Sequence, residues 1–317
     1  GATAIVVKAD NDKLYKTAKM TFKNAGNVTI TSAIEDPTTL AGTNVVGLMV
    51  EAGTAEFTPD VAKVDFVISG QGCDFDGTSY SDGTVAAFVQ DAGAKLDVQA
   101  KELNINVSAA VDPSVAASDG RKYDDAYGIR VSAGTASVGA ATKTAINVNE
   151  SRGTAYGIAA VGQDSTIEIL GDASINAVGR ANAYALYADD SGSITFGSNG
   201  NSGSLTSSGT AAFIGKGSSV TLNGNTTITA AKALEGEGTV TNAGALTIAG
   251  GTVSGFTGTF GQTAGTTAID VADFGGPVYI KGGALNVAKT LDLSRSFVTV
   301  ETSGSVVVAA GGTTTFG

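Results

Sequence analysis

The stretch DDAYGIRV, residues 124–131, decides the fold because the chain repeats it at a regular interval. The later copies are TAYGIAAV from Thr154, NAYALYAD from Asn182 and a looser TAAFIGKG from Thr210. Counted from Asp125, these starts give a period of about 28 residues, and a fixed period of ~20–50 residues is typical of a solenoid. In a solenoid each repeat is one structural unit that stacks on the next. The repeat therefore predicts a solenoid, and its motif is the opening strand of each coil.

Three short strand patterns make up each repeat. After AYGIAAV come STIEIL (165–170) and ASINAV (173–178), separated by GQD and GD. Ile167 and Ile169 alternate with polar residues, which is the period of two that a strand requires, and Ile194 and Phe196 take the same places in the next repeat. Like sequences recur with two other strands between them, so each strand pairs in parallel with its counterpart one coil away. The pattern predicts an all-β, right-handed parallel β-helix with about three strands per coil.

Two inserted loops interrupt the coils that precede this repeat. The starts Val45, Ala86 and Ala126 lie about 40 residues apart, roughly a dozen more than in the later coils. The excess is GQGCDFDGTSYSDG (70–83) in one coil and AAVDPSVAASDGRKYDD (109–125) in the next. Both loops follow a third strand, so they are expected to project side by side from one edge. Insertions in solenoids gather on one face, which is often the binding face.

The chain divides into three regions on the same pattern. Residues 1–40 are expected to hold an N-terminal cap and the first coil, and 41–234 the β-helix with ~28-residue coils and both loops. Residues 235–317 continue a Gly/Thr-rich β-helix of shorter strands, in which Phe256 and Phe260 are expected to fill the interior. The final GSVVVAAGGTTTFG is itself strand-like, so we expect the β-helix to continue beyond it.

Composition limits the chemistry. The 317 residues are 42% hydrophobic and include 44 Gly, one Cys and no His, with a net charge of −11. A chain this acidic lacks the basic stripe that nucleic acid binding needs. Without histidine, Ser-His-Asp catalysis and histidine metal sites are impossible, and the lone Cys73 allows no internal disulfide. No segment reaches the ~20 apolar residues of a membrane helix. Residues 1–20 carry no basic start followed by an apolar block, so if the protein is exported we expect its signal peptide to have been removed. We expect no cofactor and no dedicated metal site.

From about residue 45 onward, the sequence resembles the passenger domains of bacterial autotransporter adhesins, the type V secretion proteins. The likeness is carried by AYGI and AYAL, followed by STIEILGDASI and SVTLNGNTTI, and by the later GALTIAGGTVSGFTGTFGQTAGTTAIDV. The resemblance implies a signal peptide upstream and a membrane β-barrel translocator downstream. It also implies a location at the bacterial cell surface, attached to the outer membrane, or secretion.

The inserted loops supply the candidate binding residues. Their carboxylates could be solvated loop charges, could bind Ca²⁺ loosely, or could form an acidic pocket below Arg121 or Lys122, as in some β-helix polysaccharide lyases. The two tyrosines could stack on a sugar or a protein, or could anchor their own loops. The candidates are Asp74, Asp76, Tyr80, Asp82, Asp112, Asp119, Arg121, Tyr123, Asp124 and Asp125.

These observations lead to two functional hypotheses. The first is a non-catalytic passenger that mediates adhesion to a host surface protein or glycan, or self-association with another copy through the loops or the flat Thr- and Asn-rich walls. The alternative is a polysaccharide-degrading lyase or hydrolase that uses the acidic loops. Membrane attachment is expected only through the translocator barrel.

Overall fold

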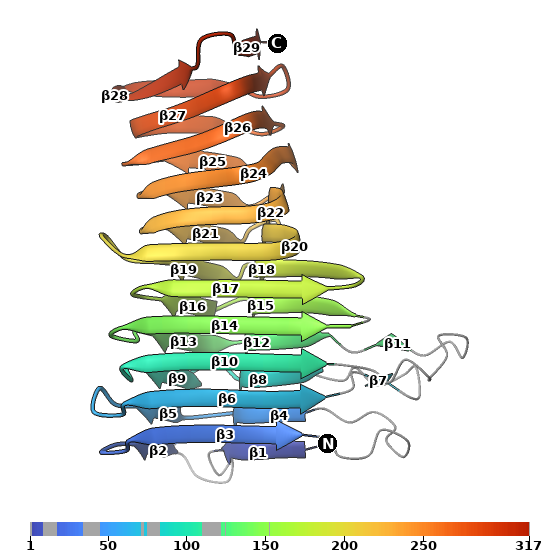
Figure 1. The fold of residues 1–317 in the computed structure, drawn as a ribbon, viewed down its shortest axis with the longest axis vertical. Helices are drawn as coiled ribbons and strands as arrows, with labels where there is room; N and C mark the ends of the chain where they lie inside the picture. Colours follow the sequence, from blue (N-terminus) through green and yellow to red (C-terminus); the bar gives the residue numbers. More distant parts are fainter. Residues whose placement is uncertain are drawn as a thin grey trace.

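The chain forms one parallel β-helix (Figure 1). A computed structural model describes residues 2–8, 18–33, 45–70, 73–74, 83–109, 122–123, 125–151 and 153–316. Within these residues, 27 strands belong to a single sheet that winds around the core. From the N-terminus upward, the chain crosses the front of Figure 1 from left to right and returns behind, so the coil is right-handed. The predicted fold class is confirmed.

Three walls, one for each strand of a coil, enclose the interior. Wall 1 holds β1 (Ala2–Val7), β4 (Val45–Val50), β8 (Thr84–Val89), β12 (Ala126–Val131), β15 (Thr154–Val161) and β18 (Asn182–Asp189). Wall 2 holds β2 (Lys19–Phe22), β5 (Thr54–Phe57), β9 (Lys95–Val98), β13 (Gly134–Val138), β16 (Ser165–Ile169), β19 (Ser193–Phe196), β21 (Ser219–Leu222), β23 (Thr239–Asn242) and β25 (Thr259–Gln262). Wall 3 holds β3 (Asn27–Ala33), β6 (Lys63–Gly70), β10 (Glu102–Ala109), β14 (Lys143–Glu150) and β17 (Ala173–Gly179).

Above β17 the coils shorten because the corner between walls 3 and 1 disappears. Continuous strands then run from wall 3 into wall 1: β20 (Ser202–Ile214), β22 (Asn225–Gly236), β24 (Ala245–Phe256) and β26 (Thr266–Phe274). The last strands are β27 (Val278–Leu293), which spans all three walls, β28 (Val298–Val308) and β29 (Thr313–Phe316). The register of core residues shows how much the coils shorten. Ile175 pairs with Leu205, whereas higher in the stack Ile228 pairs with Ile248, and the second pair is much closer in sequence than the first.

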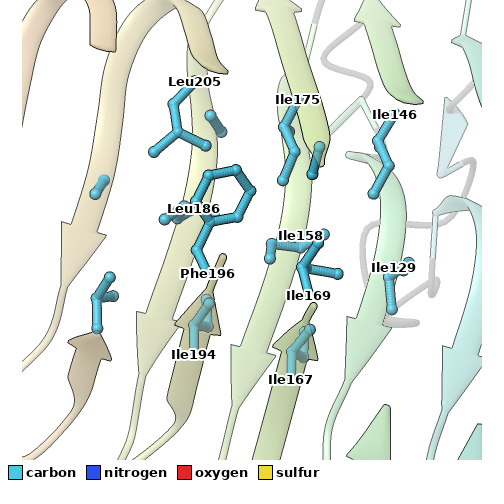
Figure 2. Packing of buried hydrophobic residues seen from close by; sticks show 14 of the residues in the cluster. Ile129, Ile146, Ile158, Ile167, Ile169, Ile175, Leu186, Ile194, Phe196 and Leu205 are labelled. Atoms are coloured by element: carbon cyan, nitrogen blue, oxygen red, sulfur yellow. The ribbon is translucent and has the colours of Figure 1, made fainter. Parts of the chain in front are cut away.

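The interior consists of columns of like residues (Figure 2). In wall 2, Ile167 pairs with Ile194, and Ile169 pairs with Phe196, as the alternation predicted. These side chains are at most 1% exposed. Because burial of one such side chain stabilises by ~1.5–3 kcal/mol, the columns supply most of the stabilisation. Phe256 and Phe260 are also buried, so the prediction that they fill the interior is confirmed.

The glycine of the AYGI motif is required by the core. Gly157 lies between Tyr156, which points outward, and Ile158, which is buried in the main core. A Cβ atom at Gly157 would lie 2.2 Å from Cγ2 of Ile175 and 2.6 Å from the carbonyl oxygen of Ala185. The repeated motif is therefore a packing signature of wall 1.

The pairing of the first three motif copies confirms the repeat, and the fourth requires a correction. Tyr127, Tyr156 and Tyr184 stand in one column. The spacing of the repeat aligned Thr210 with Asn182, but the register pairs Thr210 with Tyr184. The reason is the lost corner. Strand β20 continues from wall 3 into wall 1 without an intervening loop, so this coil is shorter.

The first coil is made of β1, β2 and β3, which pair with β4, β5 and β6. Residues 9–17 and 34–40, on which much of the predicted cap falls, lie outside the described residues.

Candidate functional site

Two short strands, one from each inserted loop, meet beside the stack, where the common corner predicted the loops to lie side by side. Strand β7 (Cys73–Asp74) pairs antiparallel with β11 (Lys122–Tyr123), so that Lys122 opposes Asp74 and Tyr123 opposes Cys73. Both strands project from the edge where wall 3 passes into wall 1 (Figure 1). This is the one antiparallel pair among the described strands, and it joins the loops of neighbouring coils.

Of the ten predicted binding residues, the structure places three. Asp74 and Tyr123 are placed on the paired strands by their backbones, and Asp125 is described in full. The other seven lie outside the described residues: Asp76, Tyr80, Asp82, Asp112, Asp119, Arg121 and Asp124. Their role stays a prediction.

Asp125 is built into the coil at the base of the second loop. Its Oδ1 accepts a hydrogen bond from the backbone N–H of Thr154 at 3.0 Å, and its Oδ2 accepts one from the Tyr127 hydroxyl at 3.4 Å. Burial raises the pKa of this carboxyl above its usual value, although both hydrogen bonds oppose the shift. Asp125 therefore links the loop edge to the outer face of wall 1.

That outer face carries an aromatic ladder, which we define as Tyr127, Tyr156, Tyr184, Tyr187 and Phe213. All five rings are partly exposed and lie on the face opposite the main core. They occupy two columns. The first column contains Tyr127, Tyr156 and Tyr184, and the second contains Tyr187 and Phe213.

The rings of the ladder form a continuous series of contacts. Tyr127 and Tyr156 stack at 4.6 Å between centroids with an interplanar angle of 5°, and Tyr187 and Phe213 stack at 4.9 Å and 12°. Edge contacts at 5.0 Å and 5.2 Å join Tyr187 to Tyr156 and to Tyr184. Such contacts contribute ~0.5–1.5 kcal/mol each and hold the rings as one rigid surface.

The lower end of the ladder continues into a cationic and apolar region. The Arg130 guanidinium lies 4.9 Å from the ring centroid of Phe88 and 5.1 Å from that of Tyr127. Below it, Phe88 packs with Val46 and Val85 in a second apolar cluster, separate from the main core.

The tyrosine hydroxyls stay neutral. Burial, followed by the charges of Asp125 and Asp189 respectively, raises the pKa values of Tyr127 and Tyr187 far above the usual phenol value. The Tyr187 hydroxyl donates to Oδ2 of Asp189 at 3.1 Å. The ladder therefore presents aromatic rings, and the hydroxyl groups of Tyr127 and Tyr187 bond to carboxylates.

At its upper end the ladder borders a hollow of about 410 Å³, which we name the glycine hollow. Phe213 forms one side, and Gly215, Gly236 and Gly255 lie along its lining. Gly236 and Gly255 have φ values of +112° and +83°, a conformation that favours glycine. Since glycine has no side chain, the backbone itself lines this part of the hollow.

Charged groups surround the glycine hollow. Asp189, Glu235, Glu237 and Lys216 line it. Glu235 accepts hydrogen bonds from the Thr210 hydroxyl at 2.7 Å and from the Lys232 ammonium at 3.0 Å. Burial raises the pKa of Glu235, but these two bonds outweigh it and hold the pKa below the usual value. Glu235 is therefore an ionised acceptor in a fixed position.

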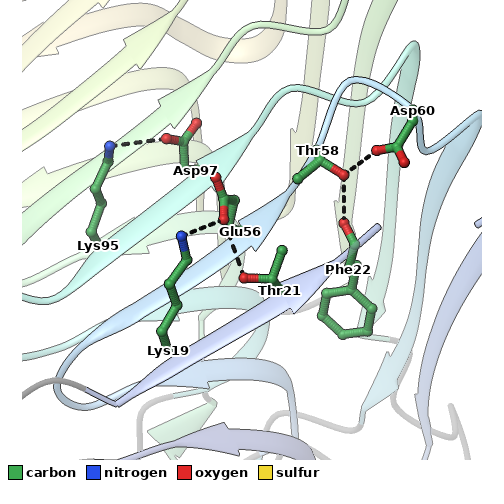
Figure 3. A network of polar contacts seen from close by, with 8 residues as sticks. All are labelled: Lys19, Thr21, Phe22, Glu56, Thr58, Asp60, Lys95 and Asp97. Carbon is green, nitrogen blue, oxygen red and sulfur yellow. Dashed lines mark hydrogen bonds and ion pairs between the residues drawn. The ribbon is translucent and has the colours of Figure 1, made fainter. Parts of the chain in front are cut away.

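Wall 2 presents a different surface. Near its lower end, Lys19 pairs with Glu56 at 2.7 Å and Lys95 with Asp97 at 2.9 Å, while Thr58 donates to the Phe22 carbonyl oxygen (Figure 3). Ion pairs of this kind are solvent-exposed and stabilise little. The outer face of wall 2 is therefore a solvated polar surface in this region.

Two further features bear on chemistry and location. No group of three or more His, Cys, Asp or Glu residues able to hold a metal ion occurs in the described part of the chain. Among the same residues, there is no helix that is long and apolar enough to cross a membrane.

Comparison with known proteins identifies no relative, since no protein-family model, curated protein or solved structure matches the chain.

The sequence reasoning missed the ladder, although its signal was present. Tyrosine recurs at positions 127, 156 and 184, which is the period of the repeat itself. Each precedes a core residue by two positions, and the intervening glycine or alanine faces inward. The motif was interpreted as one strand, and the outward direction of its tyrosine was not predicted.

Proposed function

We propose that the chain is a non-catalytic β-helical passenger that mediates adhesion or self-association. In this proposal it is displayed on a bacterial cell surface, or secreted, by a type V route. The resemblance of the repeat to autotransporter passengers supports the route. The binding surface is the loop edge together with the aromatic ladder, which meet at Asp125.

One observation carries the proposal: five aromatic rings form a continuous, partly exposed surface outside the main core. The ladder rings are not part of the interior columns, which hold most of the buried apolar residues. Aromatic side chains are enriched in binding interfaces because they offer large, rigid contact area at low conformational cost. A rigid ladder on a long stalk suits capture of a partner.

The competing explanation is that the rings only strengthen coil stacking. A binding assay on folded variants separates the two explanations. Tyr184→Ser combined with Tyr187→Ser removes the centre of the upper ladder, and its folding is checked by circular dichroism. The matched control combines Asn147→Ala with Asn176→Ala, which changes the outer face of wall 3 at comparable height.

The assay measures attachment of bacteria that display the chain to host cells, and sedimentation velocity of the purified chain. We expect the ladder variant to lose attachment or self-association at least tenfold and the control to keep it. Deleting 70–83 and 109–125 tests the loop edge in the same way. Unchanged attachment and self-association in the folded ladder and loop variants would refute the proposal.

Two further measurements test its other parts. The reading frame around this chain should encode a signal peptide upstream and a C-terminal barrel downstream, and the absence of both would overturn the surface display. Polyuronides incubated with the chain, with and without Ca²⁺, should stay intact. Cleavage would favour the polysaccharide-degrading alternative.

A further inference from the structure

The glycine hollow begins where the aromatic columns of wall 1 end. In the column of Tyr187 and Phe213, the next residue upward is Glu235. A volume of about 410 Å³ falls within the ~300–1,000 Å³ of small-molecule sites. A space of ligand size therefore lies where the column changes from ring to carboxylate.

Glycine lines part of this space. A Cβ atom at Gly236 would lie 2.1 Å from the carbonyl oxygen of Ile214, so a side chain there is unfavourable. At Gly255, a Cβ atom would meet nothing within 4 Å. Neither glycine therefore places a side chain over the hollow.

Phe213 supplies a rigid apolar side. Its ring stacks on Tyr187 at 4.9 Å, and Tyr184 contacts it at 5.8 Å with an interplanar angle of 66°. Ligands with a flat apolar face pack well on an aromatic ring that is fixed in this way.

Two carboxylates beside the ring are oriented in advance. Asp189 accepts from the Tyr187 hydroxyl and from the backbone N–H of Asp190, and Glu235 accepts from Thr210 and Lys232. A carboxylate has about four acceptor positions, so each still has capacity for ligand hydroxyl groups. Neither side chain needs to be reordered on binding.

The charges around the hollow are mixed and partly cancel. Asp189, Glu235 and Glu237 are opposed by Lys216, which lines the hollow, and by Lys232, which pairs with Glu235. Three carboxylates against two lysines disfavour an anion, and the lysines reduce the attraction for a cation. A neutral molecule with many hydroxyl groups and an apolar face matches the site better.

We propose that the glycine hollow binds one pyranose ring of a neutral saccharide. The C–H face of the sugar packs on Phe213, and its hydroxyl groups donate to Asp189 and Glu235. This inference rests on the proposed adhesive function and names a ligand class for it. If the ligand is an oligosaccharide, its other sugar rings lie on the adjoining aromatic ladder.

The test uses the full chain, fluorescently labelled, on an array of immobilised saccharides. The array carries glucose, galactose, mannose, fucose, N-acetylglucosamine and N-acetylgalactosamine, their disaccharides, and uronic and sialic acid conjugates. We expect binding to at least one neutral saccharide. Its dissociation constant is then measured by calorimetry for the wild type and for variants.

Three variants locate the site. Phe213→Ala removes the stacking ring, and Glu235→Gln removes the charge of an acceptor while keeping its shape. Thr257→Trp fills the hollow from its exposed margin without removing the ring or the carboxylates. We expect each to weaken binding at least tenfold, while Phe297→Ala, an exposed ring on another part of the chain, has no effect.

The outcomes separate this inference from the proposed function. If no neutral saccharide binds, or if binding is unchanged in Phe213→Ala and Thr257→Trp, the hollow is not a sugar site. Ladder-dependent attachment could persist in that case and would leave the adhesive function standing. Binding to the acidic conjugates alone would also overturn the inference.

Discussion

Substitution of Gly157 by alanine tests the packing that explains the repeated AYGI motif. The added Cβ would lie 2.2 Å from Cγ2 of Ile175 and 2.6 Å from the carbonyl oxygen of Ala185. Both distances are too short for real contacts. The oxygen belongs to the adjacent coil, so it can move only if the pairing of β15 with β18 is disturbed.

The magnitude follows from two opposing effects. Overpacking a core by one methyl group costs ~1–3 kcal/mol, and a contact this short belongs at the upper end. Alanine also restricts the unfolded chain, which stabilises by ~0.4–1 kcal/mol where the backbone permits it. Gly157 is outside the left-handed region, so this gain applies. The difference between the two effects predicts that Gly157→Ala lowers the free energy of unfolding by about 2 kcal/mol.

The assay is equilibrium urea denaturation followed by circular dichroism, with hydrogen exchange to locate the loosened strands. Gly261→Ala is the matched control, because its Cβ would meet nothing closer than 3.7 Å. Leucine has no Cγ2, so adding Ile175→Leu should recover part of the loss. The coil above already combines Ala185 with Leu205 at these register positions. If Gly157→Ala is as stable as Gly261→Ala, the packing argument is wrong.

Three more predictions follow from the ladder, its base and the core. Tyr156→Ala, which loses three ring contacts, should destabilise by ~1.5–4.5 kcal/mol, whereas Tyr156→Phe should stay near the wild type in the same denaturation assay. The raised pKa of Asp125 means that the folded state binds its proton more tightly, so the wild type gains stability as the pH falls from above that pKa toward about 3.8, and Asp125→Asn lacks this gain. Parallel slopes of stability against pH for the two proteins would contradict the assignment. Phe196→Ala should cost ~3–5 kcal/mol by leaving a cavity under β19, which thermal unfolding measures.

The coil architecture could be predicted because its information is periodic. Ile167, Ile169 and their counterparts alternate along each strand and recur along the chain, and these two periods define a wall and its stacking. The common corner of the inserted loops predicted that they project side by side, but not that β7 and β11 pair there. The loss of a corner has no comparable periodic signal in the sequence. The predicted alignment of Thr210 with Asn182 was therefore wrong, because Thr210 pairs with Tyr184.

The candidate site was less predictable. Alternation of apolar and polar residues shows that a strand has two faces, but it does not show which face of an AYGI-type strand is exposed. In AYGI, two consecutive residues face inward after the tyrosine, which breaks simple alternation at Gly157. The role of Asp125 depends on Tyr127 and on Thr154 in the next coil, a contact that only the stacking creates. The glycine hollow also arises from four successive coils, those of β18, β20, β22 and β24, and has no signature within any one of them.

The columns of identical residues also bear on how such a chain changes in length during evolution. Ala126, Ala155 and Ala183 stack on one another, as do the three tyrosines that follow them. A coil copied by unequal recombination would therefore meet compatible neighbours above and below. Removal of residues 154–181 would likewise bring Tyr127 beneath Tyr184 and Ile129 beneath Leu186. Mutation can therefore change the number of coils one at a time, which lengthens or shortens the β-helix while its core packing is kept.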